Sequence, residues 1–146
     1  MMRTDTGQVF RLEDYRPSDY LIPRTDLSFV LSPESTIVTA TLGIRRRDEG
    51  ARAMPLVLDG DGLKLRRLLV DGEPLAEDAY TAAPDRLVIQ NPPAAIEFTL
   101  TIETEVNPST NTALMGLYRS NGVYCTQCEA EGFRRITYGL DRPDVL

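Results

Sequence analysis

The sequence of 146 residues contains no histidine. This absence excludes a histidine-based catalytic pair, an imidazole metal ligand and a histidine pH switch from the chemistry of this chain. Cysteine is scarce as well, since Cys125 and Cys128 are too few for a disulfide framework. The first residues have no apolar segment of the kind found in secretory signals, so we expect a reducing, cytoplasmic location.

Long apolar runs and an excess of positive charge are also missing. No run approaches the roughly 20 residues needed to span a bilayer, which argues against a membrane partner. The formal net charge is −6, whereas a general nucleic-acid-binding protein is usually basic. A chain of this length with 42% hydrophobic residues is large enough to bury one hydrophobic core.

Short segments of alternating apolar and polar residues recur from Tyr20 onward. The clearest is 96–103, where Ile, Phe, Leu and Ile alternate strictly with Glu and Thr, and 38–44 follows the same period of two. Asn121-Gly122 separates two further short segments and is a strong hairpin signal, because both residue types tolerate a positive φ. This pattern predicts an all-β fold, a β-sandwich or open barrel of mostly antiparallel strands.

Two regions depart from the strand pattern. Residues 1–19 lack periodicity and are predicted to form a polar N-terminal arm, which leaves 20–146 as the β domain. The only helix candidate is short, at 133–140, and it ends before Asp141-Arg142-Pro143. We therefore predict a single β domain with at most one short helix near its C-terminus.

The pair Cys125 and Cys128 has the spacing of a zinc half-site or of a redox motif. A zinc site would need a second pair of ligands, and the βαβ setting of a redox motif is missing. Cysteines three positions apart on an extended strand also point to opposite faces of it. Two free, partly buried thiols are therefore a better interpretation than a zinc or redox module.

By the same period of two, Cys125, Gln127 and Glu129 share one face if the strand continues through Glu129. A carboxylate and an amide oxygen two residues apart suit an ammonium group, which has three donors and no acceptor. A polar face on an edge strand explains the same residues without a site. The residue pattern alone leaves both interpretations open.

Several segments together resemble one known family. They are Gly-Leu-Tyr-Arg-Ser at 116–120, Cys-Thr-Gln-Cys-Glu-Ala-Glu-Gly-Phe at 125–133 and Arg-Ile-Thr-Tyr-Gly-Leu-Asp-Arg-Pro-Asp-Val at 135–145. The upstream segments 14–22 and 61–65 fit the same family. The sequence thereby resembles the amino-terminal domain of bacterial aminopeptidase N, a family of zinc-dependent alanyl aminopeptidases of the gluzincin class. The resemblance implies a β-rich, saddle-shaped domain that packs on a catalytic domain.

The same resemblance implies that the catalytic machinery lies elsewhere. The zinc-binding HExxH motif and the GAMEN substrate-binding strand belong to the family's catalytic domain, and neither occurs in this sequence. Zinc is thus expected as a cofactor of a full-length parent enzyme and not of this chain. The sequence stops at Leu146, where the family's amino-terminal domain continues with another strand. We therefore expect a truncated domain that has no activity of its own and whose partner is the missing catalytic domain.

Carried over residue by residue, the resemblance makes Gln127 and Glu129 substrate-binding residues. In the family, the glutamate at this position binds the free α-amino group of a peptide substrate together with the glutamate of the GAMEN strand. The family also has a cis peptide bond at the position of Glu129-Ala130. Neither a catalytic residue nor a metal ligand is expected in this chain, whose further role would be to wall the substrate cavity.

A function of a different class is a free-standing β-sandwich module with a binding or structural role and no link to catalysis. A source reading frame that continues past Leu146 into the GAMEN and HExxH motifs would exclude it. A domain cut from a larger protein should expose an apolar patch that favours self-association. The candidates for this patch are Met115, Leu117, Phe133 and Ile136.

Overall fold

The chain is built almost entirely of strands in the computed structural model, which describes residues 11–49 and 53–145. Within these residues there are ten strands: β1 (Tyr20–Val30), β2 (Thr36–Arg46), β3 (Leu56–Asp59), β4 (Lys64–Val70), β5 (Glu73–Pro74), β6 (Tyr80–Ala83), β7 (Arg86–Ile89), β8 (Glu97–Val106), β9 (Gly116–Ser120) and β10 (Val123–Gln127). The helical segments in the same residues are three 3₁₀ turns, η1 (Leu12–Asp14), η2 (Glu77–Ala79) and η3 (Phe133–Arg135). The all-β prediction is confirmed. None of the helices in the described ranges could cross a membrane.

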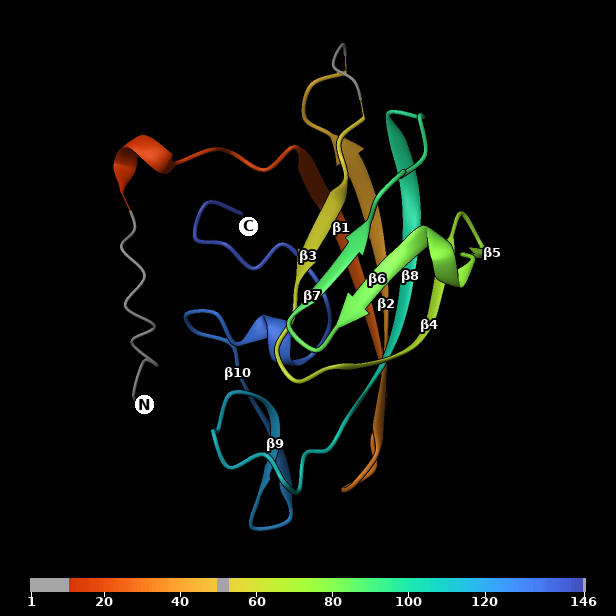
Figure 1. Ribbon diagram of the computed structural model, residues 1–146. Coiled ribbons are helices and arrows are strands. Elements are labelled where there is room, and N and C mark those ends of the chain that lie inside the picture. Colours follow the sequence, from red (N-terminus) through yellow and green to blue (C-terminus); the bar gives the residue numbers. More distant parts are fainter. Residues whose placement is uncertain (1–10, 50–52, 146) are drawn as a thin grey trace.

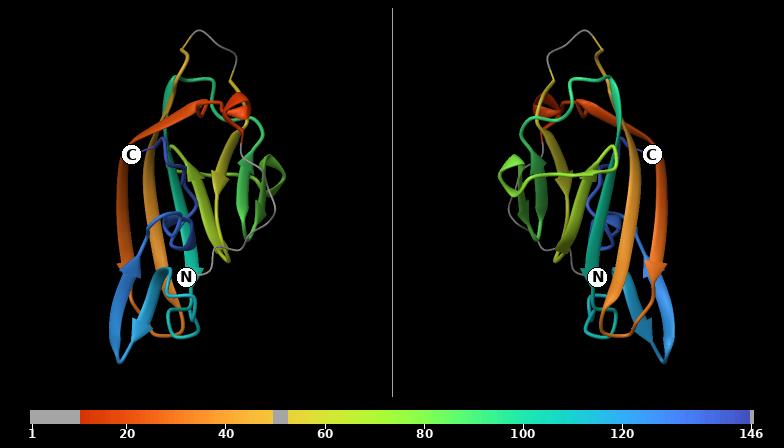
Figure 2. Two further views of the ribbon diagram at one scale, coloured as in Figure 1. Left: turned by 90° about the vertical axis from the view of Figure 1, so that its left-hand side faces the viewer. Right: turned by 90° about the vertical axis from the view of Figure 1, so that its right-hand side faces the viewer.

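The strands form two antiparallel sheets and a separate hairpin. The larger sheet has the order β1-β2-β8-β4-β5, the smaller has the order β3-β7-β6, and β9 pairs with β10. Figure 1 shows the smaller sheet in front of the larger one, with the β9–β10 hairpin at the lower end of the molecule. The two side views in Figure 2 show the hairpin beside the ends of β1 and β2.

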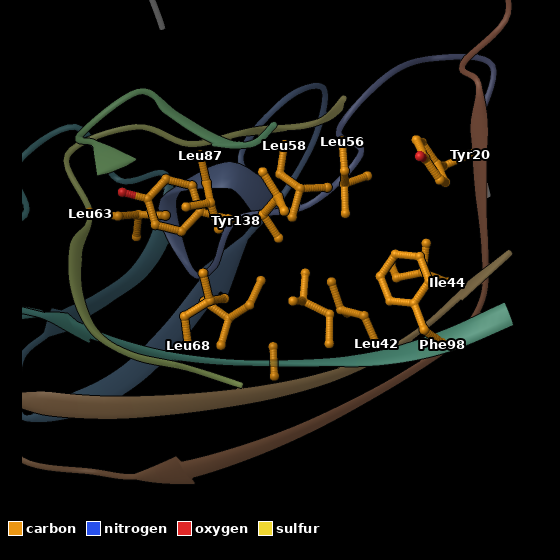
Figure 3. Close-up of a cluster of buried hydrophobic side chains, with 14 residues drawn as sticks. Tyr20, Leu42, Ile44, Leu56, Leu58, Leu63, Leu68, Leu87, Phe98 and Tyr138 are labelled. Carbon is orange, nitrogen blue, oxygen red and sulfur yellow. The ribbon is translucent and has the colours of Figure 1, made fainter. Parts of the chain in front are cut away.

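The hydrophobic core lies between the two sheets. Alternate residues of β2 and β8 point into it, and the register that pairs Leu42 with Leu100 and Ile44 with Phe98 keeps them in phase. They meet side chains of the smaller sheet and of Tyr138, and Figure 3 shows the two layers pointing toward one another. Burial of these apolar surfaces is the main favourable contribution to folding. The period of two along 38–44 and 98–102 thus correctly predicted which face is buried, whereas Ile96, which precedes β8, is 39% exposed.

The short helix predicted at 133–140 forms only in its first turn. Only η3 is helical, and the chain then extends so that Asp59 and Gly139 form an isolated antiparallel bridge. Their backbones exchange two hydrogen bonds, of 2.7 and 3.1 Å. This extension places Tyr138 in the core, where it is 1% exposed. The gain from burying a large aromatic side chain explains why the helix stops early.

The apolar patch expected at four named residues does not form there. Met115, Leu117 and Ile136 are buried, at 6%, 5% and 3% exposure, and Phe133 is half-buried, so the prediction that they form an exposed patch is wrong. Leu117 and Ile136 pack with Val38 of β2 in a second small core under the hairpin. Four exposed apolar residues lie close together in the sequence, on β1 and just after it: Leu27, Phe29, Val30 and Leu31.

The N-terminal arm is described from residue 11 onward, and its first ten residues lie outside the described ranges. Its last residues contact the other end of the chain. The Tyr15 hydroxyl donates to the Asp144 carboxylate at 2.8 Å, and Arg142 donates to the backbone oxygen of Arg16 at 2.7 Å. These two contacts hold residues 141–145 near the start of β1.

Candidate functional site

The predicted site residues lie at the end of the β9–β10 hairpin. The turn between the strands is Asn121-Gly122, with φ of 50° and 80°, as the hairpin signal predicts. Arg119 of β9 stacks over the ring of Tyr124 of β10, with its guanidinium carbon 5.2 Å from the ring centre. At the other end of the hairpin, the backbone register pairs Gly116 with Gln127. The site is therefore attached to a regular two-stranded ribbon.

β10 ends at Gln127, so the strand does not continue through Glu129. The alternation that would have placed the two side chains on one face does not apply. They are brought together in another way, because the Glu129 backbone N–H donates a hydrogen bond of 3.0 Å to the Gln127 Oε1. Both side chains are exposed. The structure thus joins the two predicted residues in one turn, by a contact that the sequence pattern did not suggest.

The turn that follows Gln127 is closed by Gly132. The Gly132 N–H donates to the Cys128 backbone oxygen at 2.9 Å. A Cβ at Gly132 would lie 2.5 Å from the Gln127 backbone oxygen and 2.8 Å from the Cys128 Cα, so only glycine fits this approach. The Glu129-Ala130 peptide bond is cis, as the family resemblance implies.

A second close approach packs this turn against β9. Gly116 has a φ of +71°, and a Cβ there would lie 2.6 Å from the Arg135 Cβ. The Asn111 side chain also donates to the backbone oxygens of Met115 and Leu117, at 2.6 and 2.9 Å. A Cβ at Gly116 would also lie 3.4 Å from the Gly132 backbone oxygen, so the start of β9 packs closely against both the turn and η3. Gly116 and Gly132 belong to the segments at 116–120 and 125–133 that carry the family resemblance, whereas the sequence assigned no role to Asn111.

The charges around the turn distinguish its two carboxylates. The Glu131 carboxylate lies 3.6 Å from the Arg134 guanidinium, which also pairs with Asp141 at 3.0 Å. Arg135 pairs with Asp61 at 2.9 Å. Within the described part of the chain, Glu129 has no ion-pair partner within 4.0 Å. Its carboxylate is thus exposed and available to a cation from outside this chain.

Cys125 and Cys128 are free thiols, and both are partly buried, as predicted. Cys128 packs against the small core under the hairpin. Burial raises the pKa of the Cys128 thiol, and the negative charge of Asp141 raises it further. Residues 11–49 and 53–145 contain no group of three or more Cys, Asp or Glu side chains that could hold a metal ion. Two surface hollows near the N-terminal arm are lined by residues 16–20, and neither includes Gln127 or Glu129.

Comparisons with known proteins agree on one family. A family model described as the Peptidase M1 N-terminal domain matches residues 22–146. Aminopeptidase N of Caulobacter vibrioides is 54% identical over 145 residues, which are 99% of this chain and 16% of that protein. The chain therefore spans about 16% of the length of this curated relative.

Solved structures share the same fold. The crystal structure of Legionella pneumophila aminopeptidase A in complex with aspartic acid matches with a TM-score of 0.83 and 34% identity, over 94% of this chain and 16% of that one. The M1 zinc metallopeptidase of Deinococcus radiodurans matches with a TM-score of 0.68 over 87% of this chain and 30% of that one. At 16% identity, the second match shows a shared fold only.

Proposed function

This chain belongs to the N-terminal domain family of the M1 peptidases, and from this membership we propose that it supplies part of the substrate site of a longer zinc aminopeptidase. In this proposal Glu129, with Gln127 beside it, binds the free α-amino group of a peptide substrate. The domain also walls the substrate cavity and packs on the remainder of the enzyme. The zinc and the groups that cleave the peptide bond belong to that remainder.

The observation that carries this proposal is the Glu129 carboxylate. It is exposed, has no ion-pair partner among the described residues and lies on the turn that Gly132 closes. An ammonium group offers three donors and no acceptor, so a carboxylate is its strongest partner. The nearby Glu131 is less suited to this role because Arg134 lies 3.6 Å from its carboxylate. Binding the amino group also sets the distance from the substrate N-terminus to the first peptide bond. A site of this kind therefore removes residues one at a time from the end of a peptide.

The zinc does not fit the described residues of this chain. The sequence has no histidine, and the described acidic and cysteine side chains form no cluster of three that could hold a metal ion. We therefore assign no catalytic step and no metal ligand to this chain. Its proposed contribution is to recognise and orient the substrate.

Replacing Glu129 by glutamine in the longer enzyme tests the proposal. A charge-assisted hydrogen bond contributes about 1.5–3 kcal/mol. The variant should therefore lower kcat/KM for peptides with a free α-amino group by roughly tenfold to a hundredfold. Substrates with an acetylated N-terminus, which carry no charge to recognise, should change far less.

Two neighbouring substitutions serve as controls. Glu131→Gln removes a charge from the same turn, and Cys128→Ser changes a thiol to which no chemistry is assigned. Both should have mild effects on kcat/KM. Circular dichroism of the Glu129→Gln variant of the 146-residue chain should match the unmodified chain, because the exposed carboxylate makes no ion pair within the described residues. An unchanged kcat/KM for free-amine substrates would exclude Glu129 as the amine-binding group.

A further inference from the structure

The two residues of the proposed site, Gln127 and Glu129, differ in the hydrogen bonds that their side chains make. The Gln127 Oε1 accepts the Glu129 backbone N–H at 3.0 Å, which engages one of the two lone pairs of this oxygen within the turn. The amide nitrogen of the same side chain carries two donors and no acceptor. An ammonium group also has only donors, so the Gln127 nitrogen cannot bind it. The Glu129 carboxylate, by contrast, has both of its oxygens available.

The backbone of Glu129 is held from two sides. Gln127 holds its N–H by the side-chain contact just described. On the other side, the Gly132 N–H donates to the Cys128 backbone oxygen at 2.9 Å. Gly132 also packs so closely against the Gln127 backbone oxygen that a Cβ would not fit. Gly132 has a φ of −89°, which any residue can adopt, so the close approach and not the backbone angle requires glycine here. The turn thus has a defined path although Gln127 and Glu129 are exposed.

From these contacts we propose that Gln127 is a positioning residue, whose amide oxygen holds the Glu129 backbone so that the carboxylate meets the substrate amine. This inference rests on the proposed function of Glu129. Without the Gln127 oxygen, the exposed Glu129 N–H is hydrogen-bonded only to water and the turn can move. A shift of about 1 Å in a substrate-positioning group can lower a rate a hundredfold. In this positioning role Gln127 acts on the reaction through Glu129.

The first test uses the 146-residue chain itself and does not depend on activity. Amide hydrogen exchange of Glu129, measured by NMR, should be slower in the unmodified chain than in Gln127→Ala by roughly two- to tenfold. Gln127→Glu retains an oxygen acceptor and should retain this protection. Thr126→Ala changes the adjacent exposed residue of β10 and should leave the Glu129 exchange rate unchanged. Equal Glu129 exchange rates in the unmodified chain and in Gln127→Ala would overturn the positioning role.

The second test is a double-mutant cycle in the longer enzyme. Gln127→Ala should lower kcat/KM for free-amine substrates by about tenfold when Glu129 is present. In the Glu129→Ala background the same substitution should change kcat/KM by less than about twofold, because no carboxylate remains to be positioned. An equal loss in both backgrounds would show that Gln127 contacts the substrate directly, and would overturn the inference.

The two proposals fail in different ways. If Glu129→Ala leaves kcat/KM unchanged, the proposed function of Glu129 is wrong, and with it the catalytic relevance of Gln127. If Glu129→Ala lowers kcat/KM but the Gln127 effect is additive, only the positioning role is wrong. The exchange measurement decides separately whether Gln127 holds the turn.

Discussion

Single residues with buried hydroxyl groups join parts of this molecule that the strand pairing leaves unconnected. Thr104 of β8 donates to the Ile136 backbone oxygen at 3.1 Å, and Tyr138 donates to the Ala83 backbone oxygen at 2.5 Å. Thr36 instead makes a local contact and donates to the backbone oxygen of Ser32, in the loop between β1 and β2, at 2.8 Å. All three hydroxyl-bearing residues are at most 1% exposed, and each hydroxyl has a partner, as buried polar groups require. The segment 133–140 is thus attached to both sheets by side chains.

Asp59 should make the stability of the chain depend on pH. Burial raises the pKa of its carboxyl above the ordinary value of 3.8, while the positive charges of Arg134 and Arg142 oppose this rise and the negative charge of Asp141 adds to it. The folded state therefore holds the proton more tightly than the unfolded state. The contribution of Asp59 to the free energy of unfolding is fully present below pH 3.8 and decreases as pH rises through the raised pKa.

The substitution Asp59→Asn removes this titration but keeps an oxygen that can accept the Asp141 N–H, now 3.2 Å from the Asp59 carboxylate. The free energy of unfolding of the variant minus that of the unmodified chain should increase between about pH 4 and pH 7. Urea denaturation at several pH values measures this difference. A difference that stays constant or decreases over this range would contradict the raised pKa of Asp59.

Cys128 should react slowly with alkylating reagents. Its raised pKa leaves less of the reactive thiolate at a given pH, and the side chain is partly buried under the hairpin. At about pH 8, alkylation of Cys128 by iodoacetamide should be slower in the folded chain than in the same chain unfolded in urea, by tenfold or more. Peptide mass spectrometry gives both rates. Equal rates would show that the fold does not protect this thiol.

Among the elements, the tight turns rely on residues that can adopt a positive φ. Asp71-Gly72 joins β4 to β5 with φ of 49° and 83°, and Asn121-Gly122 joins β9 to β10 in the same way. Gly60, directly after β3, is needed for a different reason. A Cβ there would lie 2.7 Å from the Tyr138 ring and 3.1 Å from the Pro84 backbone oxygen. The end of β3 is therefore shaped to fit a core side chain.

Substituting Gly60 by alanine should destabilise the domain by about 1–3 kcal/mol, the usual cost of overpacking a core. The added methyl group must displace Tyr138, which is 1% exposed and cannot move freely. Gly43→Ala is the matched control, because the nearest atom to its Cβ would be the Arg24 Cβ, at an ordinary contact distance of 3.5 Å. Chemical denaturation of both variants gives the free energies. Similar values for the two would contradict the packing of Tyr138 against Gly60.

At the scale of the whole molecule, β1 is the longer of the two edge strands of the larger sheet. It pairs with β2 on one side only, and its residues from Pro23 to Val30 are exposed. Leu27 and Phe29 lie opposite Ala40 and Val38 and so belong to the core-facing side, yet they remain 36% and 38% exposed. Edge strands with exposed apolar side chains are prone to pair with or pack on another surface.

We therefore expect the 146-residue chain by itself to associate through β1 at high concentration. Sedimentation velocity should show a concentration-dependent shift from monomer to dimer. Replacing Leu27 and Phe29 by serine should reduce this shift, since it removes apolar surface that association would bury. Val57→Ser is the control, because Val57 is similarly exposed, at 42%, on the smaller sheet. A chain that stays monomeric at all concentrations, or a control that acts like the β1 variant, would exclude β1 as the contact surface.

Local sequence was sufficient to predict the β class, the buried faces of β2 and β8 and the Asn121-Gly122 hairpin. These features depend on the period of two along a strand and on the φ that each turn position requires, and both can be read from neighbouring residues. The family motif at 125–133 in the same way led to the family and to the cis bond after Glu129.

Only the tertiary structure decided how distant segments meet. Met115, Leu117 and Ile136 are buried because Val38 and the turn after β10 cover them, and no local pattern encodes that contact. The contact of Gln127 with Glu129 arises because β10 ends at Gln127, where the chain turns to pack Gly132 against its own backbone. Burial and close packing depend on which surfaces face each other across the fold, and that is a property of the whole chain.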